Sequence, residues 1–335
     1  MQERNSSGPK DKMINKLIVK NFKSLKDFEI ACRKVNIFIG EPNTGKSNIL
    51  ESLGFFSFVA GYFISWEESI RIFRCVDIFF NNNINEKVII QINDSPFIIE
   101  YKNGQLIFRF ESKSNSVPVL NIYNPLSRPN FSEEFKKNFE HIKFYRFKSR
   151  KDFPNEKADF LLPSGENLLT ILYTSSSLRK IIGGLLKNYE MILEMDPLLK
   201  QLHIGKVLEE TIIVKLPYTS LSDTLQRLIY YISAIETNKN SVLIFEEPES
   251  HAFPYYTKYL AERIAFDEKN QYFITTHNPY FLLSLVEKVQ KEDITIFITY
   301  MANGKTNVKK ISEERIEKIL SCEEDIFFNL ENFLR

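Results

Sequence analysis

Cysteine, histidine and net charge are all scarce in this chain of 335 residues. It has three cysteines and four histidines, and 44 basic residues nearly cancel 43 acidic ones, which leaves a formal charge of +1. The cysteines, Cys32, Cys75 and Cys322, form no CxxC pair, which argues against a disulfide framework and a structural zinc site. Because of this cysteine pattern we expect a reducing, cytoplasmic location. The near-neutral chain also has no overall electrostatic field that attracts a polyanion.

Long apolar runs are also missing. The longest, residues 53–66, is interrupted by polar residues and is too short to cross a bilayer, so we expect no membrane span and no membrane partner. Residues 1–12 lack the apolar core of a signal peptide and are expected to form a disordered tail. Apolar residues nevertheless make up 43% of the chain, with 29 Phe, which is ample for a buried core.

Sequence patterns divide the rest, residues 13–335, into three stretches. Strands are predicted over residues 17–20, 28–32 and 35–39, and residues 55–112 include an antiparallel β meander with a hairpin turn at Asn103-Gly104. Residues 113–211 are predicted to form a helical lid, with candidate helices over 131–140, 165–186 and 189–210.

The last third alternates helices and strands, which indicates a parallel α/β sheet. Helices are predicted over 223–237 and 255–266 and buried strands over 241–245 and 271–276. A second hairpin turn at Asn303-Gly304 and a short final helix complete the pattern.

Residues 40–47 read GEPNTGKS, the G-x-x-x-x-G-K-[ST] pattern, between a predicted strand and a helical repeat that begins near Lys46. In such a loop the backbone amides surround phosphates at a helix N-terminus. Lys46 is expected to pair with the β- and γ-phosphates of ATP, and Ser47 to ligate Mg²⁺. A structural glycine turn is the alternative. The expected nucleotide-binding residues here are Gly40, Glu41, Pro42, Asn43, Thr44, Gly45, Lys46, Ser47 and Asn48.

Two further motifs place chemistry at the carboxyl ends of buried strands, the edge where ligands bind in open α/β sheets. In SVLIFEEPES, Glu246 is expected to hold Mg²⁺ and Glu247 to act as the general base that polarises water. In YFITTHNP, His277 can reach the γ-phosphate or that water. A solvated acidic turn and a packing or capping histidine are the alternatives.

Two weaker signals concern partners. Ser222 in SLSDTLQRL is expected to cap a helix, and that helix start could bind a γ-phosphate of a neighbouring subunit. In HIKFYRFKSRKDF, basic residues alternate with aromatic ones, which suits either nucleic-acid contact or a solvated basic face. The basic residues are Lys143, Arg146, Lys148, Arg150 and Lys151.

In their order along the chain, these motifs resemble SMC, RecF and OLD-type ATPases, which are ABC-type heads. The resemblance rests on NIFIGEPNTGKSNILESL, LSDTLQRL, LIFEEPESHAFP and FITTHNPYFL, and FLLPSGENLLTIL resembles stand-alone prokaryotic AAA family ATPases. It implies a P-loop NTPase fold and a head-to-head dimer, with ATP held between the P-loop of one subunit and Ser222 of the other. It also implies an effector partner, a nuclease or toxin, in a DNA-transaction or antiphage defence complex.

The chain departs from that pattern at two positions. Glu246 stands where the family usually has Asp, and no glycines follow Ser222. These departures keep open a nucleotide-gated scaffold with little turnover; a transporter ATPase subunit is a third interpretation. The segment after His277 is expected to be too short for the Toprim nuclease domain of OLD proteins, so we expect the effector to be a separate chain.

Overall fold

The structure of the protein, a computed structural model, describes residues 12–63, 65–111, 116–122, 131–208, 212–320, 326–327, 329–330 and 332. The predicted disordered tail, apart from Lys12, and Cys322 lie outside these residues; Cys32 and Cys75 are free thiols. The chain divides into two compact units. The first unit consists of Met1–Phe144, Asn240–Glu247 and Lys269–Arg335, and the second of Tyr145–Lys239 and Pro248–Glu268.

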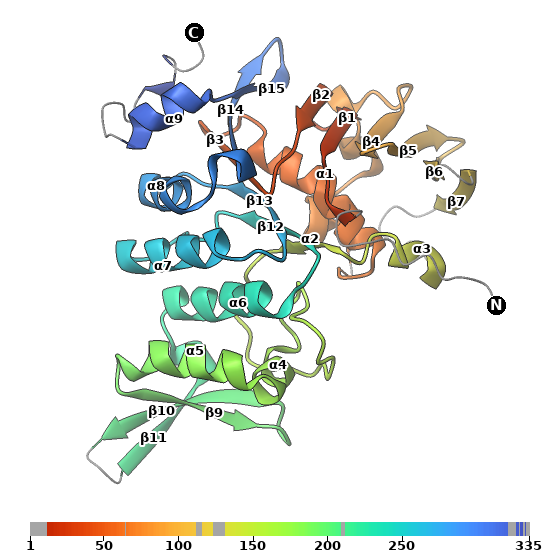
Figure 1. Cartoon of the computed structure of the whole chain (residues 1–335). Helices are drawn as coiled ribbons and strands as arrows, with labels where there is room; N and C mark the ends of the chain where they lie inside the picture. Colours follow the sequence, from red (N-terminus) through yellow and green to blue (C-terminus); the bar gives the residue numbers. More distant parts are fainter. Residues whose placement is uncertain are drawn as a thin grey trace, which may run out of the picture. The chain divides into compact units, whose positions relative to one another are not determined.

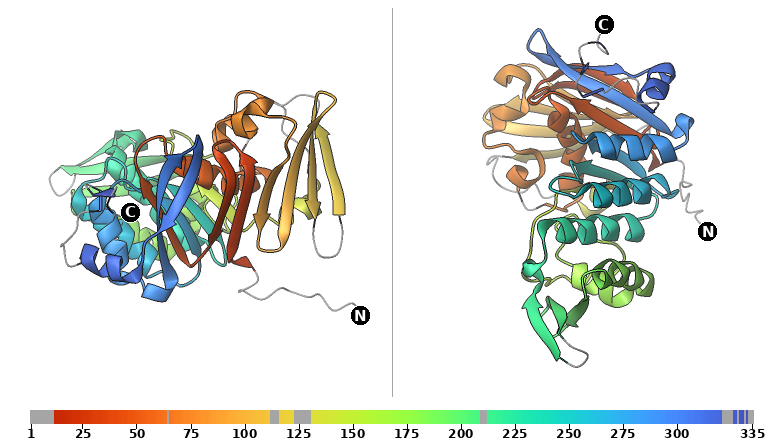
Figure 2. Two further views of the ribbon diagram at one scale, coloured as in Figure 1. Left: turned by 90° about the horizontal axis from the view of Figure 1, so that it is seen from above. Right: turned by 90° about the vertical axis from the view of Figure 1, so that its left-hand side faces the viewer.

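An antiparallel sheet of six strands forms one layer of the first unit, with the order β2-β1-β4-β5-β6-β7 (Figure 2, left). The hairpin between β5 and β6 turns at Asn103 and Gly104, both with positive φ, as the two-residue hairpin requires. The predicted meander is confirmed. The strands are β1 (Lys16–Phe22), β2 (Leu25–Ala31), β4 (Val88–Ile92), β5 (Ser95–Lys102), β6 (Gln105–Glu111) and β7 (Ser116–Ile122).

A second sheet of six strands, in the order β15-β14-β3-β13-β12-β8, carries the predicted parallel α/β core. β12, β13, β3 and β14 are parallel neighbours, and β15 returns antiparallel to β14 after the predicted turn at Asn303-Gly304. The strands are β3 (Val35–Gly40), β8 (Ile142–Tyr145), β12 (Val242–Glu246), β13 (Gln271–Thr275), β14 (Ile294–Ala302) and β15 (Lys305–Lys310).

Helix α1 (Lys46–Val59) lies beside strands of both sheets (Figure 1). It is buried along almost its whole length, and its apolar side chains join one core with residues of both sheets. A methyl group on Gly54 would lie 2.3 Å from the Phe144 ring, so this contact requires glycine. The remaining helical segments of the first unit are α2 (Trp66–Ile70), η2 (Cys75–Ile78), η3 (Phe80–Asn82), α3 (Glu133–Lys137), α8 (Pro279–Lys288), η5 (Lys291–Asp293) and α9 (Glu313–Leu320).

The second unit combines helices with a three-stranded antiparallel sheet of order β11-β10-β9, against which α5 packs (Figure 2, right). Its elements are α4 (Leu168–Thr174), α5 (Ser176–Lys187), β9 (Met191–Asp196), β10 (Gln201–Leu208), β11 (Ile212–Pro217), η4 (Tyr218–Ser220), α6 (Asp223–Thr237) and α7 (Pro254–Ala265). In the part of the chain that the structure describes, no helix has the length and apolar character needed to cross a membrane.

The prediction of a helical lid over residues 113–211 is correct only in part, because this range contains strands as well as the helices α3, α4 and α5. The candidate helix over 189–210 is the hairpin of β9 and β10, because Leu202 and Ile204 alternate inward on β10 and the turn contains Pro197. β7 and β8 also fall in this range. The other two helix predictions are confirmed in part: α3 is short, and Ser175 divides 165–186 into α4 and α5.

Candidate nucleotide site

The GEPNTGKS loop connects β3 to α1, as the sequence predicts, and its two glycines are required by geometry. Gly45 has a φ of 92°, and a Cβ there would lie 1.9 Å from Thr306 Oγ1 and 2.8 Å from Ser24 Oγ. At Gly40, with a φ of 148°, a Cβ would lie 2.4 Å from the Thr299 carbonyl oxygen. Only glycine accommodates both the backbone conformation and these contacts. Within the loop, residues 41–43 are exposed.

Lys46 begins α1 and its side chain folds back over the loop. The ammonium is buried and donates to the carbonyl oxygens of Gly40 at 2.9 Å and Glu41 at 2.7 Å. Burial lowers the Lys46 pKa to about 8, and the negative charges of Glu247 and Glu41 oppose that shift. The influence of Glu247 on this pKa is consistent with a short separation between Lys46 and Glu247, the general base that the sequence predicts.

The two residues after Lys46 differ in their side-chain contacts. Asn48 Nδ2 donates to Ser24 Oγ at 2.6 Å, which ties the first turn of α1 to the β1–β2 turn. The half-buried Ser47 hydroxyl makes no hydrogen bond within the described residues, so it remains available to a ligand. Thr44 Oγ1 donates to the Glu41 carbonyl oxygen at 2.8 Å and lies 2.8 Å from Thr299 Oγ1, so Thr44 serves the shape of the loop.

Glu246, Glu247 and His277 lie at the carboxyl edge of the same parallel sheet. Glu246 ends β12 opposite Thr275 of β13. Glu247 has a φ of 44°, in the left-handed region that non-glycine residues rarely occupy, and its N–H donates to the Thr275 carbonyl oxygen at 3.1 Å. His277 follows β13, and its Nε2 lies 3.3 Å from Glu247 Oε1. The structure thus brings these three predicted residues together with the loop.

Arg71 belongs to this site, although no sequence pattern singles it out. Its guanidinium contacts Glu246 Oε1 at 2.5 Å and also pairs with Glu51 of α1. Glu51 is 1% exposed and has a second partner in Lys23, at 2.5 Å. Desolvation of Arg71 is the largest influence on its pKa, but the charges of the two glutamates outweigh it and raise that pKa. Lys23, Glu51, Arg71 and Glu246 form a charge network around the buried Glu51, in which the Arg71 side chain is 48% exposed; it is called the Glu51 network below.

The donor set fits Mg²⁺ that is shared with a nucleotide. Within the described residues no group of three His, Cys, Asp or Glu side chains could hold a metal alone. Mg²⁺ usually binds one or two protein oxygens, with phosphates and water completing its coordination. The Ser47 hydroxyl and the Glu246 carboxylate are oxygen donors of this kind, and Glu246 would have to exchange or share its contact with Arg71.

The predicted partner residues lie outside this group. Ser222 is in the second unit, where its Oγ caps α6 by accepting from Leu225 N at 3.3 Å, so the capping prediction is confirmed.

The basic residues proposed for nucleic-acid contact differ in exposure. Lys143 is 4% exposed and donates to Ser241 Oγ at 3.0 Å, because it lies on the buried strand β8. The prediction that Lys143 contacts nucleic acid is therefore wrong. Arg150 is paired with Glu166 at 3.6 Å and Lys151 is exposed; for Arg146, Lys148, Arg150 and Lys151, nucleic-acid contact stays a prediction.

Comparison with known proteins finds sequence relatives over most of the chain. The family model described as AAA ATPase domain matches residues 13–190, which is more than half of the chain. A curated protein of Helicobacter pylori named ATP/GTP phosphatase is 23% identical over 341 residues, which cover 84% of this chain and 90% of that protein.

Solved structures align with most of this chain at low sequence identity. A crystal structure of the Smc head bound to the C-winged helix domain of ScpA aligns with a TM-score of 0.55 and 16% identity, and covers 90% of this chain and 99% of that one. The Pyrococcus furiosus Smc head domain with an extended coiled coil, bound to the C-terminal domain of ScpA, aligns with a TM-score of 0.49 and 15% identity, over 93% of this chain and 99% of that one. The first alignment establishes an SMC-head-like, P-loop NTPase fold, as the sequence predicts.

Proposed function

The chain belongs to the AAA ATPase domain family and is an ATPase; from this premise we propose that its ATP hydrolysis depends on Mg²⁺ and controls a head-to-head dimer. The observation that carries the proposal is the 3.3 Å contact between His277 Nε2 and Glu247 Oε1, at the sheet edge where Lys46 begins α1. Lys46 binds the β- and γ-phosphates. Glu247 accepts the proton of the attacking water, and His277 orients that carboxylate.

Ser47 and Glu246 are the residues that would hold the metal. Mg²⁺ supplies positive charge to the β- and γ-phosphates. Ser47 contributes a hydroxyl that has no competing hydrogen bond within the described residues. Glu246 contributes a carboxylate at the end of β12, with Arg71 as its counter-ion when metal is absent. The extra methylene of Glu relative to Asp gives the carboxylate a longer reach.

Three variants test the chemistry. We expect Lys46→Ala to abolish ATP binding, because the phosphates lose their buried cation. Glu247→Gln keeps ATP binding but stops turnover, since an amide cannot accept the proton. Glu287→Gln, at an exposed position of α8, is the matched control and keeps wild-type phosphate release. Equal phosphate release by wild type and Glu247→Gln would remove Glu247 from the role of base.

The second half of the dimer site is assigned to Ser222 and the N-terminus of α6 from another copy. A helix N-terminus favours an anion because its first N–H groups lack intrahelical partners. We expect Glu247→Gln to form a dimer with ATP and Mg²⁺, measured as the native mass in solution. Adding Ser222→Arg should abolish that dimer and leave ATP binding by the single chain intact. A dimer that persists in the double variant would contradict this assignment.

The output is proposed to be a separate effector, a nuclease or toxin, in a DNA-transaction or antiphage defence complex. Its support is the resemblance of the ordered motifs to SMC, RecF and OLD-type ATPases. The test is phage plating on cells that carry the gene with its neighbours, with wild type or Lys46→Ala. Loss of protection in the variant supports an ATP-driven complex. Equal protection, or none with wild type, contradicts the defence role.

A nucleotide-gated scaffold with little turnover is the second candidate, and the contact between Arg71 and Glu246 favours it. An arginine that holds the metal-binding carboxylate opposes assembly of the hydrolytic site. Phosphate release by purified protein, with and without DNA, decides between the two. ATP binding without phosphate release in every condition would favour the scaffold.

A further inference from the structure

A small cavity lies in the first unit, between α8, the start of β14, the end of β15 and α9. Its volume is about 30 Å³, room for about two water molecules or a short aliphatic group. Five of its lining residues have branched aliphatic side chains: Val286, Val289, Ile294, Ile311 and Ile316. β14 runs parallel to β3, so its start lies at the amino edge of the sheet, opposite the edge that carries the nucleotide loop.

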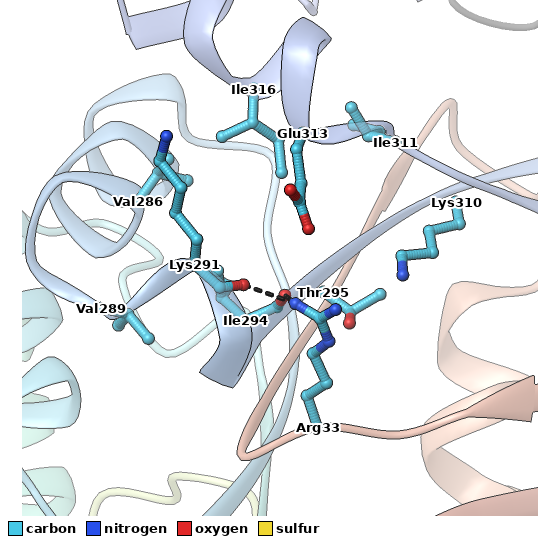
Figure 3. A pocket seen from close by; sticks show the side chains of 10 residues that line it. All are labelled: Arg33, Val286, Val289, Lys291, Ile294, Thr295, Lys310, Ile311, Glu313 and Ile316. Atoms are coloured by element: carbon cyan, nitrogen blue, oxygen red, sulfur yellow. Dashed lines mark hydrogen bonds between the residues drawn. The ribbon is translucent and has the colours of Figure 1, made fainter.

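Two cations border this cavity without an acidic partner among the described residues. Arg33 Nη1 donates to the carbonyl oxygens of Lys291 at 2.5 Å and Ile294 at 3.2 Å, and these bonds leave its charge uncompensated. Lys310 likewise has no ion pair in that part of the chain. Lys291 differs, because its ammonium pairs with Glu317 at 2.5 Å and points away from Arg33 (Figure 3). Positive charge therefore accumulates beside an apolar wall.

The Thr295 hydroxyl provides a second, independent sign of a ligand. Thr295 lines the cavity and is 2% exposed, and its Oγ1 has no hydrogen-bond partner within the described residues. A buried hydroxyl without a partner is unfavourable, and buried polar groups in proteins are nearly always satisfied. A ligand atom that accepts a hydrogen bond would satisfy it.

Glu313 limits the charge that the ligand can carry. Its carboxylate and the Arg33 guanidinium point into the same space from opposite sides (Figure 3). Two uncompensated cations and one nearby anion favour a single negative charge over two, because a dianion would be repelled by Glu313.

We propose that this cavity binds a small aliphatic monocarboxylate, with the carboxylate held by Arg33 and Lys310, an oxygen accepting from Thr295, and the short apolar tail against Ile311 and Ile316. The ligand is either a free organic acid or the carboxyl terminus of a peptide that ends in a small aliphatic residue. Both sources share the charge, the size and the hydrogen-bonding pattern that the cavity presents. The inference is independent of the proposed role of Glu247, because the two sites lie at opposite edges of the sheet.

The test is a titration of the full chain with isobutyrate, followed by ligand-detected NMR. For a ligand of six heavy atoms we expect a Kd on the order of 1 to 10 mM. Lys310→Gln and Thr295→Val should each weaken binding about fivefold or more, because each removes one polar contact. Lys288→Gln, an exposed lysine of α8 outside the lining, is the matched control and should not change the Kd. Isobutyramide, which has the same shape and no charge, should not bind detectably.

Three results would overturn the proposal: no binding of isobutyrate at about 50 mM, equal binding of isobutyramide, or an unchanged Kd in both Lys310→Gln and Thr295→Val. The first would mean that the cavity holds only water, the second that the negative charge of the ligand is not recognised, and the third that isobutyrate binds elsewhere. Acetyl-glycyl-valine and its C-terminal amide separate the two sources. Tighter binding of the peptide acid than of isobutyrate indicates a chain terminus, and weaker binding indicates a free acid. Lys46→Ala should bind isobutyrate as wild type does, which keeps this test distinct from that of the nucleotide site.

Discussion

Replacing Arg71 with Met tests the Glu51 network directly, because Met keeps the unbranched apolar stem of the side chain and removes the charged guanidinium. Loss of one partner from a buried ion pair costs about 3 to 5 kcal/mol when the other charge is left alone. Glu51 keeps Lys23 at 2.5 Å, and Glu246 is 16% exposed, so neither glutamate is left fully uncompensated. We therefore expect a loss of about 2 kcal/mol in the free energy of unfolding.

The assay is urea unfolding at neutral pH, first without nucleotide and then with ATP, in the latter case with and without Mg²⁺. The matched control is Arg74→Met, whose partner Asp77 lies 2.7 Å away; Arg74 is solvent-exposed, so its loss should change the free energy of unfolding little. Without Arg71, Glu246 is a stronger ligand, so Mg²⁺ should stabilise Arg71→Met more than wild type. If the two variants unfold at the same urea concentration and respond equally to Mg²⁺, the network neither supports the fold nor restrains Glu246.

Two further predictions concern stability. Ion pairs with Lys102 at 2.7 Å and Lys87 at 2.8 Å lower the Glu100 pKa from 4.5 to about 2, so its stabilising contribution, about 1 to 2 kcal/mol after screening, is complete above pH 4.5 and is lost as the pH falls through 2. Acid unfolding of Glu100→Gln should therefore be less steep than that of wild type, whereas the exposed-pair control Glu29→Gln should unfold as wild type does. Gly45→Ala should cost about 2 kcal/mol or more in thermal unfolding and weaken ATP binding, because a Cβ cannot fit against Thr306; wild-type values for both would contradict the close approach.

Local signals in the sequence were sufficient for the two hairpins with Asn-Gly turns and for the start of α1. Asn103-Gly104 and Asn303-Gly304 supply the positive φ angles of their turns, and the apolar repeat after Lys46 continues as a helix. The β9–β10 hairpin was missed because its Leu, Met, Glu and Lys residues also favour helix, and pairing between strands decided the outcome. Pro197, in the turn, was the local signal against a continuous helix.

The sequence predicts the site residues that end or follow a buried strand. It does not predict ion pairs between residues that are far apart in the sequence. Glu246, Glu247 and His277 end or follow strands that the apolar pattern identifies. Arg71 meets Glu246 across 175 positions of sequence, and no periodicity or motif records such a contact. The prediction that Lys143 contacts nucleic acid is wrong for a related reason, because the strand that carries Lys143 is buried on both faces. Partners of charged residues are set by the packed structure.

The backbone of Glu247 has a consequence for how the site can move. Its N–H donates a hydrogen bond to the carbonyl oxygen of Thr275, the last residue of β13, and His277 follows two residues later. The positions of both side chains are therefore set by the end of the same strand. A shift of the GEPNTGKS loop relative to β13 would change the distance from Lys46 to this pair and leave the distance between Glu247 and His277 unchanged. Glu247 and His277 therefore move together, and the distance that can change in this site is the one between this pair and the GEPNTGKS loop.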